Sequence, residues 1–581
     1  MSGTIGCLTP GAVGSITIER AHAVFWEHAW GAESREKVGA TAMSQRIAIG
    51  LIWLVAVASA APAVAEGKTP DTVAPAAAVV VQVPADPVVK GLDEALGRLA
   101  LGPSDPERKD QDALKAFYAA RSNAPLWVVD GKLTTRADKA MAEMSASADY
   151  ALDPKDFPLP TPPGADPAKL AAADLQLSVA ALTYARYARG GRIPDPAEML
   201  STQLDRRPQW IDPKQVLEDL AKSDEPGAYL RSLNPKHEQF ERLRQLYVKA
   251  LPKDGKPAKL SKDAKRLRAN MEMWRWLPDD MGTQLGVGKG MYVFNNIPEF
   301  MQYVYKDGQV VRTERIVAGQ LDKQSAIFSR PLKYVVLRPQ WRVPESIKVN
   351  ELWPSLKRNG GYMRKFALEV QTKDGAAVDW KKIDWTSTDI REYEVVQPSG
   401  PKNVLGHVKF SFPSQHTIYM HDTPDKYMFN AARRTLSHGC LRVQNPMDLA
   451  RMILKEDKGW DADKVAELDK SGPLNNEIAI DKRIPIHLVY FTQWVDDNGK
   501  LKSFADVYGH EKRVIQGLDG KWDAVDHGYD HLAPVEVKAS GDLVASGGDA
   551  TDGQVDTTKS KGKGKSQDAF GDLLSVLFGG P

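Results

Sequence analysis

The spacing of apolar residues changes from a helical to an alternating period near the middle of the chain. Up to about residue 278, apolar side chains recur every three or four positions, as they do along one face of a helix. This pattern is clearest at 111–120, 175–188 and 259–278. Asp166-Pro167 and Asp212-Pro213 each pair a capping aspartate with a first-turn proline, which is typical of a helix start. Residues 91–278 are therefore predicted to form a helical scaffold domain.

Beyond residue 278 apolar and polar positions alternate, which is the period of a β-strand. Strands are predicted at 291–294, 301–305, 312–317, 333–337, 407–412 and 417–421. Asp307-Gly308 has the composition of a tight hairpin turn. Residues 279–515 are thus predicted to be a mainly β domain, with a partly helical insertion at 343–406 of the kind that covers a cleft. The predicted fold class is α+β.

The segment that begins at Met43 has the features of an export signal. Arg46 precedes an apolar run at 47–60, and Ala63-Val64-Ala65 supplies the small-x-small pattern that signal peptidase cleaves. A membrane anchor is the alternative, but the run is shorter than the ~20 apolar residues that span a bilayer. We therefore expect a signal peptide at 43–65, cleaved at about Ala65-Glu66, and an exported protein associated with the membrane only through that signal.

Three further stretches are predicted to stay outside the folded domains. Residues 1–42 lack the pattern of an export signal and are interpreted as a misassigned N-terminal extension. Residues 66–90 are rich in alanine and proline without a helical period, which is typical of an extended linker. Residues 533–581 consist largely of Gly, Ser, Thr, Asp and Lys, so this tail is predicted to be disordered.

Composition narrows the classes of function. The chain has 581 residues, of which 42% are hydrophobic and 26% charged, as in an ordinary globular protein. Its 77 basic and 75 acidic residues leave a net charge of +2, so no excess of basic charge points to nucleic acid. No nucleic-acid partner is predicted.

The chain has 2 cysteines, and Cys7 falls in the predicted extension. The mature protein would then carry Cys440 alone, whereas exported proteins usually pair their cysteines in disulfides. A lone thiol in such a protein is either a buried structural residue or a reactive group. The neighbours of Cys440 have to distinguish these two cases.

Cys440 lies in the sequence Thr-Leu-Ser-His-Gly-Cys-Leu-Arg, just ahead of a predicted helix start at Asn445-Pro446 with Asp448 in its first turn. The positive end of that helix is expected to lower the pKa of the thiol. Gly439 would let the backbone approach a substrate, and the N–H groups beside Cys440 could bind an oxyanion.

The alternating residues before Asp422 place Ile418 and Met420 toward the core and His421 on the opposite side. His421 and Cys440 on adjacent elements would form a Cys–His pair that generates the thiolate and transfers protons to and from the reacting amines. Arg442 could hold a substrate carboxylate, orient the loop or be a solvated surface charge.

These residues alone allow other interpretations of Cys440 and of the nearby histidines. A single cysteine in a β domain is more often a core residue than a catalyst. A zinc site from Cys440, His438 and His421 is conceivable, but these residues lack the spacing of structural zinc sites, and no metal is predicted. His438 could instead support a neighbouring side chain by a hydrogen bond. His407 and His416 are interpreted as surface strand residues.

Ser437–Arg442, together with His421 nineteen residues before the cysteine, resembles the signature of the YkuD-type L,D-transpeptidase domain. Further segments resemble the large Gram-negative, YcbB-like branch of that family: 271–278, 293–305, 337–346, 405–412, 419–424 and 484–494. Residues 117–128 resemble the N-terminal scaffold of the same branch, so the similarity covers roughly 110–520. Between 233 and 260 we find no counterpart of the small peptidoglycan-binding module common in the branch.

The resemblance implies a reaction and a set of roles. In that family a cysteine attacks the carbonyl that joins diaminopimelate and D-alanine in a tetrapeptide stem. D-alanine leaves, and the acyl group passes to an amine of a second stem as a 3→3 cross-link. By resemblance, Cys440 is the nucleophile and His421 the base. The other implied site residues are His438 and Gly439 at the oxyanion pocket, and Arg442, Tyr419 and Trp341 for substrate binding.

The resemblance also implies that 343–406 is the capping subdomain of this branch. The expected partners are the donor tetrapeptide and an acceptor amine of peptidoglycan, and no cofactor is expected because thiol and imidazole suffice. One alternative is the same fold acting as an L,D-carboxypeptidase or attaching an envelope protein to peptidoglycan. Another is a catalytically inactive wall-binding scaffold, which the presence of Cys440, His421 and Arg442 disfavours. The sequence predicts no oligomeric state.

Overall fold

The computed structural model describes residues 86–252, 259–282 and 290–535. The predicted extension at 1–42, the signal peptide at 43–65 and most of the predicted linker and tail lie outside these residues. Where linker and structure overlap, the prediction was wrong. Asp86 accepts a hydrogen bond from the backbone N–H of Val88 (2.8 Å) and caps a helix, α1 (Pro87–Arg98).

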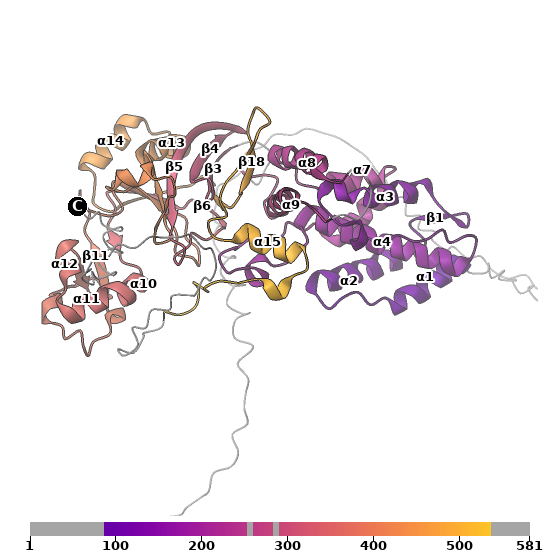
Figure 1. Ribbon diagram of the computed structural model, residues 1–581, viewed down its shortest axis with the longest axis horizontal. Coiled ribbons are helices and arrows are strands. Elements are labelled where there is room, and N and C mark those ends of the chain that lie inside the picture. The colour runs from indigo at the N-terminus through magenta and orange to yellow at the C-terminus, as the bar shows by residue number, and fades with distance from the viewer. Residues whose placement is uncertain (1–85, 253–258, 283–289, 536–581) are drawn as a thin grey trace, which may run out of the picture. The chain divides into compact units, whose positions relative to one another are not determined.

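The N-terminal half is helical, as its apolar spacing predicts (Figure 1). Its longest helix, α4 (Pro167–Gly190), begins after Asp166, whose carboxylate accepts the backbone N–H groups of Ala168 and Lys169. The elements that share one hydrophobic cluster with α1 and α4 are α2 (Asp105–Ala119), β1 (Val128–Val129), β2 (Lys132–Leu133), α3 (Thr135–Ser145), α6 (Pro213–Lys222) and α7 (Pro226–Ser232). Short helical turns lie at η1 (Ser147–Tyr150), η2 (Pro154–Asp156) and α5 (Pro196–Met199).

Helices α8 (Glu238–Ala250) and α9 (Lys262–Arg275) pack in the same hydrophobic cluster as the β-sheet, although the sequence assigned them to the helical domain. The end of α9 also contacts α4. The buried guanidinium of Arg275 donates to the carbonyl of Ala188 (3.1 Å), and the carboxylate of Glu272 accepts the backbone N–H of Arg192 (2.6 Å). Helix α9 therefore joins the helical cluster to the β domain.

The β domain is built on a meander of β3 (Met291–Asn296), β4 (Met301–Lys306) and β5 (Gln309–Gly319). Asp307 and Gly308 form its predicted turn with φ values of 49° and 80°, as a tight hairpin requires. The meander belongs to an 11-stranded sheet with the order β16-β7-β12-β13-β15-β5-β4-β3-β17-β6, and β14 also pairs with β5. The remaining strands are β6 (Ser329–Pro331), β7 (Tyr334–Leu337), β12 (Val408–Ser411), β13 (Met420–His421), β14 (Thr435–Ser437), β15 (Leu441–Val443), β16 (Asn476–Ala479) and β17 (Pro485–Val489).

The strand predicted at 417–421 is shorter than expected. Only Met420–His421 pairs as β13, because Thr417 has a left-handed backbone (φ 52°) that interrupts the extended chain. Ile418 and Met420 are nevertheless buried, as the alternation predicts. The turn η6 (Lys426–Asn430) follows this strand before β14.

Helix α13 (Pro446–Lys458) begins at the predicted proline, but Asn445 does not cap it as expected. Asn445 has a left-handed backbone (φ 47°), and its side chain donates to the carboxylate of Glu314 (3.3 Å). The other C-terminal elements are α14 (Ala462–Ser471), the hairpin of β18 (Gln493–Val495) and β19 (Leu501–Ser503), α15 (His510–Leu518) and η7 (Trp522–Ala524). None of the helices in the described part of the chain is both long and apolar enough to span a membrane.

The insertion forms a substructure with its own hydrophobic cluster, which extends from Trp341 to Leu405. The predicted helical part is present, with α10, α11 and α12 drawn beside β11 (Figure 1). The part predicted as irregular contributes β9, β10 and β11 to a four-stranded sheet in the order β10-β9-β11-β8, and β8 lies just before the predicted insertion. Its elements are β8 (Trp341–Arg342), α10 (Glu345–Ile347), η3 (Lys348–Leu352), α11 (Trp353–Arg358), α12 (Gly361–Lys365), β9 (Glu369–Gln371), β10 (Ala377–Val378), η4 (Trp380–Lys382), η5 (Ile390–Glu392) and β11 (Glu394–Gln397). We refer to residues 341–405 as the cap.

Candidate active site

The loop that carries Cys440 connects two strands that both pair with β5. Strand β14 runs parallel to β5 and β15 runs antiparallel to it, so the chain reverses within residues 438–440. The hydroxyl of Ser437 donates to the carbonyl of Cys440 (2.6 Å) and accepts the backbone N–H of Gly439 (3.2 Å). Ser437 thereby fixes the shape of the loop.

Gly439 is required by the backbone that packs against it. Its φ is 108°, and a Cβ atom there would lie 3.3 Å from the carbonyl oxygen of Gln324. Ser325 donates its hydroxyl to the carbonyl of Gly439 (2.6 Å). Of the N–H groups beside Cys440 that were predicted to bind an oxyanion, the N–H of Gly439 donates to Ser437.

The strand register places four predicted residues on one face of the sheet. Strands β13 and β15 pair in parallel, with Met420 opposite Leu441 and His421 opposite Arg442. Met420 and Leu441 point into the core, where both are fully buried. Because side chains alternate along each strand, the side chains of Tyr419, His421, Cys440 and Arg442 share the opposite face.

Cys440 keeps partial exposure to solvent, and its sulfur lies 4.0 Å from the carbonyl oxygen of Thr417. Burial raises the pKa of the Cys440 thiol to about 11, while hydrogen bonds from the backbone N–H and hydroxyl of Tyr419 act to lower it. The sequence analysis expected a lowered pKa from the helix that starts at Pro446. That prediction was wrong because desolvation outweighs the favourable contacts, so the free protein holds a neutral thiol.

His421 is buried, and its ring lies 5.7 Å from that of Tyr419. Burial, together with the charge of Arg442, lowers the pKa of His421 to about 3. Its Nδ1 is hydrogen-bonded to the carbonyl oxygen of Asp422, which can only accept. Nδ1 therefore carries the hydrogen of the neutral imidazole, and Nε2 is the nitrogen that can accept a proton.

Arg442 lies beneath the loop and is 2% exposed. Its guanidinium donates to the hydroxyl of Thr423 (3.2 Å) and to the carboxylate of Asp425 (3.3 Å). Of the three roles considered for Arg442, these contacts favour orientation of the loop and disfavour both a solvated charge and a direct clamp on a substrate carboxylate.

His438 is contacted by the cap. The Oε1 atom of Glu351, in η3, lies 2.9 Å from Nε2 of His438 and 2.8 Å from Nζ of Lys323. Burial alone would raise the pKa of Glu351, but the two partners hold it below its usual value. His438 thus supports the contact between the cap and the loop.

Trp341 also joins the cap to the site. It lies in the cap's hydrophobic cluster, 4% exposed, and a hydrogen bond from its side chain acts on the hydroxyl of Tyr419. That hydroxyl in turn bonds the sulfur of Cys440. Trp341 is thus linked to the sulfur of Cys440 through the hydroxyl of Tyr419.

The sequence analysis missed three residues of this site: Lys323, Glu351 and Lys409. Lys409, in β12, pairs with His421 across the antiparallel ladder, so it lies on the same face as Cys440. Its Nζ lies 4.6 Å from the centre of the Tyr419 ring. The alternation of Val408, Lys409 and Phe410 was a usable signal for Lys409, whereas nothing in the sequence pairs Glu351 with His438.

His416 contradicts its prediction as a surface strand residue. It is 5% exposed and lies outside any strand. Its Nε2 lies 3.0 Å from the carboxylate of Asp205, and its Nδ1 lies 2.6 Å from Nε2 of His531. His407, in contrast, is exposed as predicted. Across 86–252, 259–282 and 290–535, no group of three or more His, Cys, Asp or Glu side chains is arranged to hold a metal ion.

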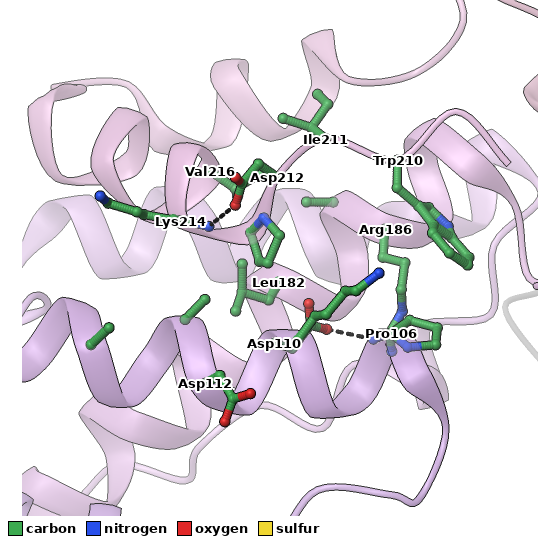
Figure 2. Close-up of a pocket in the computed structure, with 15 residues that line it drawn as sticks. Pro106, Asp110, Asp112, Leu182, Arg186, Trp210, Ile211, Asp212, Lys214 and Val216 are labelled. Atoms are coloured by element: carbon green, nitrogen blue, oxygen red, sulfur yellow. Dashed lines mark hydrogen bonds and ion pairs between the residues drawn. The ribbon is translucent and has the colours of Figure 1, made fainter. Parts of the chain in front are cut away.

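A cavity of about 610 Å³ lies among α2, α4 and α6, away from these residues in the sequence (Figure 2). Arg186 and Asp110 form an ion pair in its wall, and both side chains are nearly buried. Burial raises the pKa of Asp110 to about 6, while the charge of Arg186 acts to lower it. Trp210 covers Gly190 at the rim, where a Cβ atom would collide with the ring. We refer to this space as the scaffold cavity.

The fold and this face define a protein class: an α+β protein whose β domain carries a cysteine, just before one strand, on the same face as a histidine of the adjacent strand, with a cap in contact with the cysteine loop. Comparison with known proteins gives the family. Residues 290–465 match the YkuD L,D-transpeptidase catalytic domain, and residues 112–246 match the Scaffold domain. The chain carries an L,D-transpeptidase catalytic domain of the YkuD family behind a Scaffold domain.

The chain is also similar to a curated protein of Haemophilus influenzae named "Putative L,D-transpeptidase". The two are 28% identical over 417 residues, which cover 71% of this chain and 80% of the relative. The chain is therefore a distant homologue of that protein, and the α+β fold and family resemblance predicted from the sequence are confirmed.

Proposed function

We propose that the chain is a periplasmic peptidoglycan L,D-transpeptidase that forms 3→3 cross-links through a thioester on Cys440. The observation that carries the proposal is the register of β13 and β15, which puts the only cysteine of the described residues on one face with a buried, neutral histidine. The catalytic domain matched at 290–465 contains both residues.

In the first half-reaction, Cys440 attacks the carbonyl that joins diaminopimelate to D-alanine in the donor stem. As the sulfur–carbon bond forms, the thiol proton passes to Nε2 of His421, because Nδ1 already carries a hydrogen donated to Asp422. The carbon–nitrogen bond then breaks, and His421 returns the proton to the departing amine of D-alanine. A thioester and free D-alanine result.

In the second half-reaction, the side-chain amine of a second stem attacks the thioester. His421 accepts a proton from the attacking amine, the carbon–sulfur bond breaks, and the proton returns to the sulfur. Proton transfer concerted with attack suits a neutral pair, since the raised pKa of Cys440 leaves little thiolate in the free protein.

Tyr419 contacts the sulfur of Cys440, and the cap contacts the loop that carries it. The hydroxyl of Tyr419 favours the charged form of Cys440 and is itself hydrogen-bonded by Trp341. Glu351 connects the cap to His438, two residues before the sulfur. Both contacts pre-organise the loop for the step in which negative charge develops.

The acceptor separates this proposal from its alternatives. Water in place of the amine would make the chain an L,D-carboxypeptidase, and a lysine of another protein would make it an envelope-protein attachment enzyme. The experiment is muropeptide analysis after incubation of the protein with a disaccharide-tetrapeptide. A cross-linked dimer together with free D-alanine supports the proposal. A disaccharide-tripeptide alone would assign hydrolysis, and an unchanged substrate would contradict an enzymatic role.

A further inference from the structure

The face of the sheet that carries Cys440 also carries the cationic side chain of Lys409, which takes no part in the proposed catalytic steps. Lys409 lies opposite His421 in the ladder of β12 and β13, and cross-strand neighbours on one face have Cβ atoms roughly 5 Å apart. Its ammonium group sits 4.6 Å from the centre of the Tyr419 ring, and Tyr419 bonds the sulfur of Cys440. Lys409 therefore borders the reacting sulfur.

Lys409 is partly withdrawn from water without an opposite charge beside it. Within the described ranges, no carboxylate lies within ion-pairing distance of its ammonium group, which lies over the neutral ring of Tyr419. Burial lowers the pKa of Lys409, and the charges that oppose this are those of a Cys440 thiolate and the more distant Glu477. Holding a cation there without an anion costs stability, which a bound anion would offset.

Two other cations that contact the site, Arg442 and Lys323, already have carboxylate partners. Arg442 is paired with Asp425 (3.3 Å), and Lys323 is paired with Glu351 (2.8 Å). In each pair the charge of the cation is already balanced by a carboxylate. Unlike Arg442 and Lys323, Lys409 has no carboxylate partner among the described residues, so its charge can be offset by an anionic group that approaches Cys440.

The donor stem of the proposed reaction brings such a group to the sulfur. In a tetrapeptide that ends in D-alanine, the terminal carboxylate is separated from the scissile nitrogen by one carbon atom, so it arrives beside Cys440 with the carbonyl under attack. We propose that Lys409 binds this terminal carboxylate and so selects donors that end one residue beyond the scissile bond. The inference rests on the proposed function and names a specificity determinant of the same site.

The test is a binding measurement that needs no turnover. In a Cys440→Ala background, the affinity for the free-acid tetrapeptide and for the same peptide amidated at its C-terminus is measured by calorimetry, with Lys409 intact or replaced by Met. We expect Lys409→Met to weaken binding of the free acid about tenfold or more, and to change binding of the amide by less than about twofold. Lys409→Arg, which keeps the charge, should retain most of the preference for the free acid.

Equal losses for the two peptides would overturn the proposal, because they would assign Lys409 a general role in shaping the face. A loss that follows amidation of the second diaminopimelate carboxyl instead would also overturn it. The proposed function is tested separately by the products of the unmodified protein. If peptide binding depends on Lys409 but the unmodified protein forms no transfer product, the carboxylate-binding site is supported and the transpeptidase function is contradicted.

Discussion

A cationic side chain is partly removed from water both in the scaffold cavity and on the face of the sheet that carries Cys440. The two cations differ in whether an opposite charge lies beside them. In the scaffold cavity, Arg186 is paired with Asp110, so each of the two charges has an opposite charge beside it (Figure 2). On the face that carries Cys440, Lys409 lies over the ring of Tyr419 and lacks an ion-pair partner within the described residues. A balanced pair supports the fold, whereas an unbalanced cation beside a nucleophile indicates a ligand.

The largest effect on the acylation rate should come from replacing His421, the proposed proton acceptor. His421→Gln should slow acylation of Cys440 by about 10²–10⁴-fold, because the thiol proton then has no acceptor. The measurement is the rate of covalent modification by a carbapenem, followed by intact mass. His407→Gln is the matched control, since His407 is exposed and its side chain bonds only Asp469 among the described residues. Equal rates for the two variants would remove His421 from the mechanism.

The next effect concerns stability and should be confined to the scaffold cavity. Asp110→Asn removes a carboxylate whose ionised form is disfavoured by burial despite its pairing with Arg186, so the free energy of unfolding at pH 7 should stay the same or rise by up to about 2 kcal/mol, with no change in the carbapenem rate of the folded protein. Denaturant titration measures the change. Asp112→Asn, an exposed aspartate on the same helix, should cost nothing. Lys409→Met should leave stability unchanged or increase it, since it removes an unbalanced charge.

The contribution of Asp110 to stability should also depend on pH, in a direction that follows from its raised pKa. Burial raises the pKa of Asp110 to about 6 from about 4 in the unfolded chain, so folding favours the protonated carboxyl. This group contributes stability below pH 4 that is lost as the pH rises through 6. The difference in stability between the wild-type protein and Asp110→Asn should therefore depend on pH within this window. A difference that stays constant from pH 4 to 7 would contradict the raised pKa.

A third prediction concerns the sulfur. Burial raises the pKa of Cys440 to about 11, so the thiolate fraction should increase about tenfold per pH unit between pH 7 and 9. The rate of alkylation by iodoacetamide, a neutral reagent, should rise in proportion. A rate that is already constant near pH 7 would indicate a preformed thiolate–imidazolium pair and would contradict the neutral pair.

The smallest effect is expected at the contact between cap and loop. Glu351→Gln removes the charge that faces Lys323 and His438 but keeps a hydrogen-bonding group, so acylation should slow by about fivefold. Glu345→Gln, an exposed glutamate of the cap, is the control. An unchanged rate in Glu351→Gln would mean that this contact does not position the loop.

The elements of the β domain followed from local patterns where the pattern was strong. Alternation predicted the meander of β3 to β5, and Asp307-Gly308 predicted its turn, because both depend on residues close in sequence. The four-stranded sheet of the cap was missed because its strands have 2 to 4 residues, too few to show a period. The shortened β13 was missed because nothing in the sequence forces Thr417 into a left-handed conformation.

The candidate site was predictable only in part. The residues of Ser437–Arg442 and His421 lie within a recognisable signature, and strand periodicity puts Tyr419 with them. Lys409 and Glu351 depend on strand pairing and on a contact 87 residues from His438 along the chain, which no local pattern encodes. The direction of the Cys440 pKa was misjudged because burial depends on tertiary packing, whereas the helix start was visible in the sequence.

The central claim is that Cys440 is the nucleophile of an acyl transfer. It is tested most directly by intact-mass analysis of the folded protein after exposure to a carbapenem, with peptide mapping of the product. We predict one covalent adduct per chain, located at Cys440, and none in Cys440→Ala. Folded protein that stays unmodified, or an adduct on any other residue, would contradict this account.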